Sequence, residues 1–310
     1  MLNRHFAERL VLLVLGAYLT YFFTLKLLDY SMLQELSSDV IEIPSDLKLN
    51  NHEKMIYSMV VKKENISTDF EDVKGLEATK NTIQKQVIIP LKHLNTNTHK
   101  LLQPPNGIIF HGSPGTGKTM LAKALCKSSG FNFINFSTNI IENKLFGESS
   151  KLVNSLFTLA NKLKPCVVFI DEIDGFFNKR NDFEQGFITN IKTLFYMKMD
   201  GMISKDNSIV FIGATNRIGS IDPAMLRRMR LHIHIGLPDW TTRKTMFKHY
   251  LGPLLNFDIE GIETETDGLS GSDIHEICKV AANDSYDYVS KSFLNFNQEV
   301  LLNTTKEFVT

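Results

Sequence analysis

From position 69 onward, short apolar runs alternate with longer segments that have helical periodicity. Such apolar runs predict strands that are buried on both faces, and the expected strands are 108–111, 166–171 and 209–214. The helices expected around them are 79–91, 119–129, 151–163 and 187–199. Strands that alternate with helices favour a parallel sheet with helices on both faces. The predicted fold class is therefore α/β.

After position 238 the apolar runs end and only helical patterns continue. The helices expected there are 241–251, 272–290 and 297–308. Asp239 precedes the first of them and is a favourable N-cap, since its carboxylate can accept a backbone N–H. The pattern thus predicts a large α/β domain at 67–238 and a small helical domain at 239–310.

The most apolar stretch of the chain lies at about 10–28, within an N-terminal segment 1–29. About nineteen residues at ~1.5 Å each cover most of a hydrocarbon core of roughly 30 Å. A cleaved signal peptide and a buried amphipathic helix are the alternatives. No small-residue cleavage site follows the run, however, and no face of it is polar. We predict a single transmembrane helix in the lipid bilayer, whose flanking charges do not fix its orientation.

The segment 30–66 is mixed and polar, and it is expected to be a linker that carries a short helix at 52–61. Across the whole chain, 34 Lys and Arg residues balance 34 Asp and Glu residues. This balance gives no electrostatic reason to expect a nucleic-acid partner. The three cysteines are far apart and predict buried thiols in a reducing compartment.

Directly after the strand at 108–111 comes a glycine-rich motif of the form G-x-x-x-x-G-K-T. Glycines let the backbone wrap closely around phosphate oxygens, and a helix N-terminus attracts the anion. Lys118 is expected to reach the β- and γ-phosphates of ATP, and the Thr119 hydroxyl to bind Mg²⁺. The predicted nucleotide-binding residues of this segment are Gly112, Ser113, Pro114, Gly115, Thr116, Gly117, Lys118, Thr119 and Met120.

Two further strands end in polar residues that suit ATP hydrolysis. The strand at 166–171 ends in Asp171, expected to hold Mg²⁺, and is followed by Glu172, expected to polarise the attacking water. The strand at 209–214 leads to Asn216, expected to bind that water or the γ-phosphate. Shortly after it, Arg227 and Arg228 are suited to stabilise charge on a neighbouring subunit's nucleotide. A surface salt bridge is the equally weighted alternative for either arginine.

The order of these motifs resembles that of a single-ring AAA ATPase. The resemblance runs from about 70 to 282 and includes the stretches Phe-Glu-Asp-Val-Lys-Gly-Leu at 70–76, Asp-Pro-Ala-Met-Leu-Arg-Arg at 222–228 and Ser-Gly-Ser-Asp at 270–273. It implies that four residues flank the adenine and ribose, namely Asp72, Gly75, Gly271 and Ser272.

An apolar anchor, a short linker and one AAA module resemble, more narrowly, the dislocases of the outer mitochondrial membrane and peroxisome. This resemblance implies a homo-hexamer that faces the cytosol and threads mislocalised tail-anchored membrane proteins through its pore. Leu145, Phe146 and Gly147 would form the pore loop, with Phe146 gripping the client through contact area rather than hydrogen bonds. It does not choose between mitochondrion, peroxisome and endoplasmic reticulum, and it names no client or adaptor.

Two positions depart from the dislocase pattern. Leu145 stands where an aromatic residue is usual, and His232 where a second arginine is usual. The resemblance implies that Arg228 contacts the ATP of the neighbouring subunit, and whether Arg230 or His232 completes the trans-acting pair stays open. Related AAA ATPases that sever microtubules or disassemble membrane complexes are the alternative function. A membrane-bound AAA metalloprotease is disfavoured because the sequence contains no H-E-x-x-H motif.

Overall fold

The computed structural model describes residues 43–44, 47–93, 103–142, 148–179, 186–203, 208–287, 292–293 and 296–309. The predicted anchor at 10–28 and the predicted pore loop at 145–147 lie outside these residues. Within the described ranges, no helix combines the length and hydropathy needed to span a bilayer.

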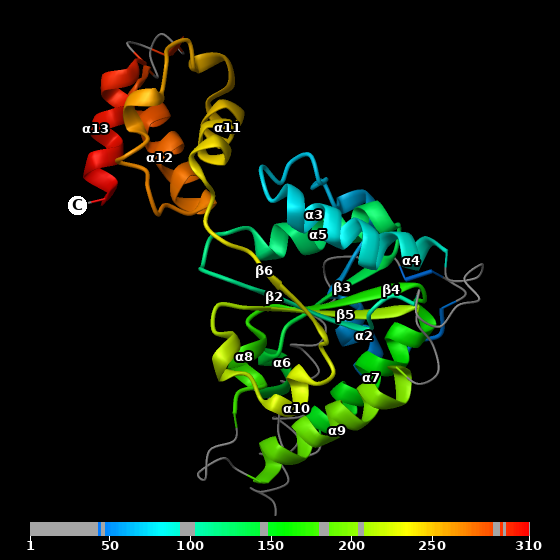
Figure 1. Cartoon of the computed structure of the whole chain (residues 1–310). Helices are drawn as coiled ribbons and strands as arrows, with labels where there is room; N and C mark the ends of the chain where they lie inside the picture. The colour runs from blue at the N-terminus through cyan, green and yellow to red at the C-terminus, as the bar shows by residue number, and fades with distance from the viewer. Residues whose placement is uncertain are drawn as a thin grey trace, which may run out of the picture.

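A six-stranded sheet forms the centre of the larger part of the molecule (Figure 1). Its strand order is β1-β3-β4-β5-β2-β6, and all neighbours are parallel except β1, which is antiparallel to β3. This confirms the predicted parallel α/β sheet. The strands are β1 (Val60–Val61), β2 (Gly107–His111), β3 (Asn132–Phe136), β4 (Cys166–Ile170), β5 (Ile209–Thr215) and β6 (Leu231–His234).

Helices cover both faces of the sheet, as predicted (Figure 1). Successive side chains of a strand point to opposite faces, so Ile109 and Ile108 lie in different core clusters. One face carries α3 (Glu77–Ile83), the π-helical turn η2 (Gln84–Ile88), α4 (Ile89–Lys92) and α5 (Lys118–Ser129). The other carries α2 (Asn51–Tyr57), α6 (Asn139–Glu142), α7 (Glu148–Lys162), α8 (Ile173–Phe176), α9 (Gly186–Ile203) and α10 (Pro223–Leu226).

Two predicted helices differ from those observed. The helix expected at 52–61 ends at Tyr57, and the β-branched pair Val60–Val61 instead joins the sheet edge as β1. The helix expected at 79–91 widens into a π-helical turn, where the N–H of Ile89 bonds to the carbonyl of Gln84. Pro90 follows directly and has no N–H to continue an α-helical ladder.

The C-terminal helices α11 (Trp240–Leu251), α12 (Gly271–Asp284) and α13 (Gln298–Val309) bury a separate apolar core. The side chain of Asp239 accepts the N–H of Thr242 at 2.9 Å, which confirms the predicted cap. The helix predicted at 272–290 ends at Asp284. The expectation that only helices follow position 238 was wrong, because two short strands come after this helix. The two-stranded pair β7 (Tyr286–Asp287) and β8 (Ser292–Phe293) follows, with the rings of Tyr286 and Phe293 5.1 Å apart across it.

The remaining short elements are single 3₁₀ turns in the connections between these helices and strands. They are η1 (Lys63–Asn65), η4 (Ile218–Ser220), η5 (Gly252–Leu254) and η6 (Glu260–Ile262). The connection from β6 to α11 leads from the sheet into the C-terminal helices, so the C-terminal ends of the parallel strands lie close to those helices (Figure 1).

Candidate nucleotide-binding site

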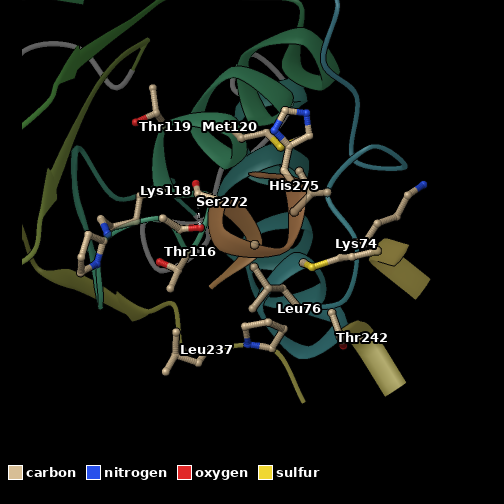
Figure 2. Close-up of a pocket in the computed structure, with 18 of the residues that line it drawn as sticks. Lys74, Leu76, Thr116, Lys118, Thr119, Met120, Leu237, Thr242, Ser272 and His275 are labelled. Carbon is tan, nitrogen blue, oxygen red and sulfur yellow. Dashed lines mark hydrogen bonds between the residues drawn. The ribbon is translucent and has the colours of Figure 1, made fainter. Parts of the chain in front are cut away.

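A cleft of about 1000 Å³ opens between the glycine-rich loop, the ends of β4 and β5, and the helices α11 and α12. Clefts at the carboxyl ends of parallel strands are the usual ligand sites of open α/β sheets. Figure 2 shows side chains that converge on it from the glycine-rich loop and from the helices α11 and α12. Residues that the sequence predicted and that line the cleft are Asp72, Pro114, Gly115, Thr116, Gly117, Lys118, Thr119, Met120, Asp171, Glu172, Asn216, Gly271 and Ser272.

The glycine-rich loop joins β2 to α5 and supplies the cleft floor. Gly117 has φ +92° and serves as the N-cap of α5, so the positive end of that helix faces the cleft. Gly112 is the first residue of the loop, and a Cβ there would clash with the Ile235 carbonyl oxygen. The loop conformation therefore depends on glycine both for its dihedral angles and for its close approach to Ile235, the residue that follows β6.

Lys118 is largely buried, and its ammonium donates hydrogen bonds to the carbonyl oxygens of Gly112 and Ser113, at 3.0 and 2.7 Å. Burial lowers the pKa of Lys118, and the nearby carboxylate of Asp171 opposes this shift. Both carbonyl partners belong to the glycine-rich loop, so the lysine is held where a phosphate group on that loop would meet it. A cationic side chain in this place could bind the β- and γ-phosphates.

Thr119 and Asp171 come from different elements, yet the threonine hydroxyl donates to a carboxylate oxygen of Asp171 at 2.8 Å. The other oxygen of Asp171 accepts the backbone N–H of Glu172 at 3.0 Å. Hydroxyl and carboxylate oxygens are the hard ligands that Mg²⁺ prefers, so the pair fits a magnesium ion with water and phosphate as its other ligands. Glu172 lies beside this pair and lines the cleft.

Asp72 and Gly75 belong to the loop before α3. Asp72 lines the cleft, but its carboxylate accepts the backbone N–H of Asp69 at 2.7 Å. Gly75 does not line the cleft. A Cβ at Gly75 would lie 2.5 Å from the Thr242 side chain of α11, so the glycine allows this loop to approach the C-terminal helices.

Gly271 and Ser272 form the first turn of α12, whose N-cap Ser270 completes a capping box with Asp273. The backbone N–H of Ser272 donates to the carbonyl of Gly115 at 3.2 Å. The C-terminal helices are therefore hydrogen-bonded directly to the glycine-rich loop, and a nucleotide in the cleft would contact both.

A second group of cleft residues was not predicted from the sequence. Thr242, Met246 and Tyr250 recur every four residues and so lie along one side of α11. His275 of α12 also lines the cleft, with its ring 4.9 Å from that of Tyr250. The four-residue spacing was the available signal, although in sequence it reads as an ordinary helix face. The other cleft residues that were not predicted are Val73, Lys74, Leu76, Gly236, Leu237, Pro238, Asp239 and Glu276.

The predicted arginine pair lies outside the cleft lining. The guanidinium of Arg228 forms a forked ion pair with Asp200 and lies 4.8 Å over the ring of Tyr196. Arg227 is exposed and, within the described part of the chain, forms no ion pair. The two neighbouring arginines therefore have different surroundings.

Three histidines lie close to the start of the glycine-rich loop. The rings of His111 and His234 are 5.1 Å apart, and His232 projects from the same face of β6 as His234. Burial, and then the nearby His234, His232 and Lys118, lower the pKa of His111. Arg230, the alternative to His232 in the sequence analysis, is exposed.

Comparisons with known proteins agree with this geometry. The model of the ATPase family associated with various cellular activities (AAA) matches residues 108–239. The outer mitochondrial transmembrane helix translocase of Danio rerio is 38% identical over 242 residues, which are 76% of this chain and 63% of that protein. The mitochondrial sorting homolog of Caenorhabditis elegans is 32% identical over 286 residues, covering 89% of this chain and 84% of that protein.

Among solved structures, the FIGL-1 AAA domain in complex with ADP superposes with a TM-score of 0.71 at 28% identity. The match covers 86% of this chain and 92% of that domain. This chain thus spans less than two thirds of the length of the zebrafish relative and most of the length of the solved domain.

Proposed function

The chain belongs to the AAA ATPase family and, within it, to the group of outer mitochondrial transmembrane helix translocases, and from this premise we propose that it is a membrane-anchored ATPase that extracts mislocalised tail-anchored proteins from the bilayer. It works as a homo-hexamer whose ATPase domain faces the cytosol at the outer mitochondrial membrane. Its clients pass through the central pore of the ring.

The observation that carries the proposed ATP hydrolysis is the convergence of Lys118, Thr119, Asp171, Glu172 and Asn216 on one cleft. Lys118 and the N–H groups of the glycine-rich loop bind the phosphates. Thr119 and Asp171 would hold Mg²⁺, which would neutralise negative charge on the phosphates.

Hydrolysis needs a water molecule in line with the bond between the β- and γ-phosphates. The carboxylate of Glu172 accepts a proton from this water while the water oxygen bonds to the γ-phosphorus. The bond between the γ-phosphorus and the bridging oxygen of the β-phosphate breaks at the same time, and ADP leaves. The amide of Asn216 orients the water or the γ-phosphate. The protein's part is mainly positioning and electrostatic stabilisation, because phosphoryl transfer needs little covalent chemistry from the enzyme.

Pulling of the client through the pore depends on the segment that precedes α7. Leu145, Phe146 and Gly147 precede Glu148, the first residue of α7, and they form the pore loop in this proposal. Phe146 grips unfolded chain of any sequence through apolar contact area. An arginine of one subunit contacts the nucleotide of its neighbour and so responds to whether ATP or ADP is bound. Hydrolysis therefore moves the pore loops of successive subunits one after another.

The proposal is tested with full-length protein in liposomes that contain a model tail-anchored protein, with ATP and a soluble acceptor. We expect ATP-dependent release of the client. The variant Glu172→Gln should bind ATP but should not release the client. Phe146→Ala should keep basal ATPase and lose release, while Glu71→Gln, an exposed charge change, should keep both. Vigorous ATPase without release would overturn the translocase proposal and favour the severing or disassembly alternative.

A further inference from the structure

Thr215 is the last residue of β5, and its side chain contacts α8, the short helix that follows β4. The hydroxyl donates a hydrogen bond to the Asp174 carboxylate at 2.6 Å. Thr215 is 1% exposed and Asp174 is half-buried, so the hydroxyl end of this bond is shielded from water. Asp174 follows Glu172 by two residues within α8. The bond therefore ties the turn that carries Glu172 to the strand that leads into Asn216.

The same two segments also meet through apolar packing. Ile173, next to Glu172, lies so close to β5 that a Cβ at Gly213 would come within 2.6 Å of its Cδ1 atom. Ile173 is fully buried. The packing fixes the distance of the turn from the sheet, and the Thr215–Asp174 bond fixes its position along the strand.

The Thr215 hydroxyl also controls the backbone on the far side of Asn216. It accepts the N–H of Arg217 at 2.8 Å while it donates to Asp174. Asn216 lies between these two anchored residues and projects into the cleft. One hydroxyl thus uses its donor and an acceptor to hold both neighbours of Asn216 in place.

The turn itself adopts a conformation that needs such support. Glu172 has φ +46°, in the left-handed region, although it has a side chain. This region is unfavourable for a non-glycine residue, and such strain persists where surrounding contacts enforce it. Asp171 accepts the Glu172 N–H on one side, and Asp174 is held by Thr215 on the other.

We propose that Thr215 and Asp174 form a latch that sets the separation between the Glu172 carboxylate and the Asn216 amide. They are positioning residues, since neither lines the nucleotide cleft. The inference rests on the proposed ATP hydrolysis by Glu172 and Asn216, and it adds a geometric requirement. Binding of the phosphates by the glycine-rich loop does not need the latch, whereas the attack of water does, because Glu172 holds the water while Asn216 orients that water or the γ-phosphate that it attacks.

The test is a comparison of kcat and nucleotide affinity in full-length protein. Thr215→Val keeps the shape of the side chain and removes the hydroxyl, while Thr215→Ser keeps the hydroxyl. We expect Thr215→Val to lower kcat by roughly 10- to 100-fold, with the Kd for ADP within about twofold of the parent value. Thr215→Ser should restore most of the rate.

A double-mutant cycle with Asp174→Ala separates the latch from general damage. Both single variants break the same bond, so the double variant should be no slower than the slower single variant. Asp174→Asn keeps an accepting oxygen and should lose less than Asp174→Ala. The latch would be overturned if the kcat losses of the two single variants multiplied in the double variant. It would also be overturned if Thr215→Val had the kcat of the parent, or if Thr215→Val and Thr215→Ser lost the same amount of kcat. Absence of hydrolysis in the parent protein would instead overturn the proposed function.

Discussion

The guanidinium of Arg228 and the carboxylate of Asp200 form a two-pronged ion pair within one subunit. Nε lies 2.8 Å from one carboxylate oxygen and Nη2 lies 2.6 Å from the other. Nη1 donates to the carbonyl of Ala224 at 2.6 Å. Arg228 is thus occupied with holding its own segment to α9. Arg227, exposed beside it, forms no ion pair with the described residues, and in the proposed hexamer it could extend toward a neighbouring subunit.

We therefore predict different effects for the two arginines. Arg227→Ala should reduce the ATPase activity of the assembled protein by about a hundredfold or more, because the neighbour's phosphates lose a positive charge in the transition state. Its thermal midpoint should not change. Arg228→Ala should lower the midpoint, since a forked pair and a cation–π contact are lost. ATPase rates and melting curves of both variants, measured at one protein concentration, check this prediction.

The control is Asp200→Ala, which removes the partner and leaves Arg228 in place. It should resemble Arg228→Ala in stability, at a cost on the order of 1 kcal/mol, because the pair is partly exposed. If Arg228→Ala abolished hydrolysis while Asp200→Ala and Arg227→Ala did not, Arg228 would be the trans-acting residue.

Gly115 offers a test of how the C-terminal helices meet the glycine-rich loop. Its φ is +73°, and a Cβ there would lie 2.4 Å from the Ser270 hydroxyl and 3.1 Å from the Ser272 Cβ. Gly115→Ala should therefore displace the start of α12 and weaken ADP binding by about tenfold or more. Isothermal titration with ADP measures the effect.

Gly130 provides the matched control for this change. Its φ is +75°, but a Cβ at Gly130 would have no neighbour within 4 Å. Gly130→Ala should cost stability of about 1 kcal/mol from the left-handed backbone and leave the Kd for ADP unchanged. Equal loss of affinity in the two variants would show that the effect arises from strain and not from the contact with α12.

The sheet was only partly predictable from sequence, for a physical reason. The strands β2, β4 and β5 are central and covered on both faces, so they are continuous apolar runs that stand out. The strand β6 lies at an edge and alternates between exposed and buried residues, and β3 contains two asparagines among its apolar residues. Their patterns are short and mixed, and tertiary pairing rather than local composition makes them strands.

The site residues likewise fall into a group that was predictable from sequence and a group that was not. Residues of the glycine-rich loop and the strand ends form linear motifs, so sequence order sufficed to predict them. The side of α11 that faces the cleft, by contrast, is defined by how α11 packs on the loop at Gly75. The latch from Thr215 to Asp174 and the pair from Arg228 to Asp200 join residues 41 and 28 positions apart, and no local pattern announces either contact.

Lys118 can be tested apart from hydrolysis. Lys118→Ala removes the only charged group that bonds the carbonyls of Gly112 and Ser113 within the described residues. We expect ATP and ADP affinity to fall by about a hundredfold, because a charge-assisted contact to phosphate is lost in a partly buried place. Lys123→Ala, on the same helix but outside the cleft, should bind nucleotide normally. Fluorescence titration with a labelled nucleotide measures both, and unchanged affinity in Lys118→Ala would contradict the assignment.

Glu53 is the carboxylate that attaches the helix α2 to α7. Glu53 is 2% exposed, and it accepts hydrogen bonds from Lys162 at 2.8 Å and from Thr158 at 2.9 Å. Burial alone would raise the pKa of Glu53, but the hydrogen bonds from Lys162, Asn50 and Thr158 lower it below its ordinary value. The contact helps to keep α2 on α7, the helix that follows the predicted pore loop.

The sign of the pH dependence follows from this shift. Below its ordinary pKa of about 4.3, the unfolded chain binds a proton at Glu53 more readily than the folded chain does. The stability from Glu53 is thus complete above that pH and is lost as pH falls through the lower folded value. Glu53→Gln should reduce the free energy of unfolding at pH 7 by about 1–3 kcal/mol and flatten its decline in acid. Urea unfolding of the detergent-solubilised full chain from pH 7 to pH 3 measures both quantities.

The control is Glu77→Gln, which breaks an exposed pair with Lys80. It should change the free energy of unfolding at pH 7 by only a few tenths of a kcal/mol. Parallel pH curves for Glu53→Gln and the parent would show that Glu53 does not make this acid-sensitive contribution.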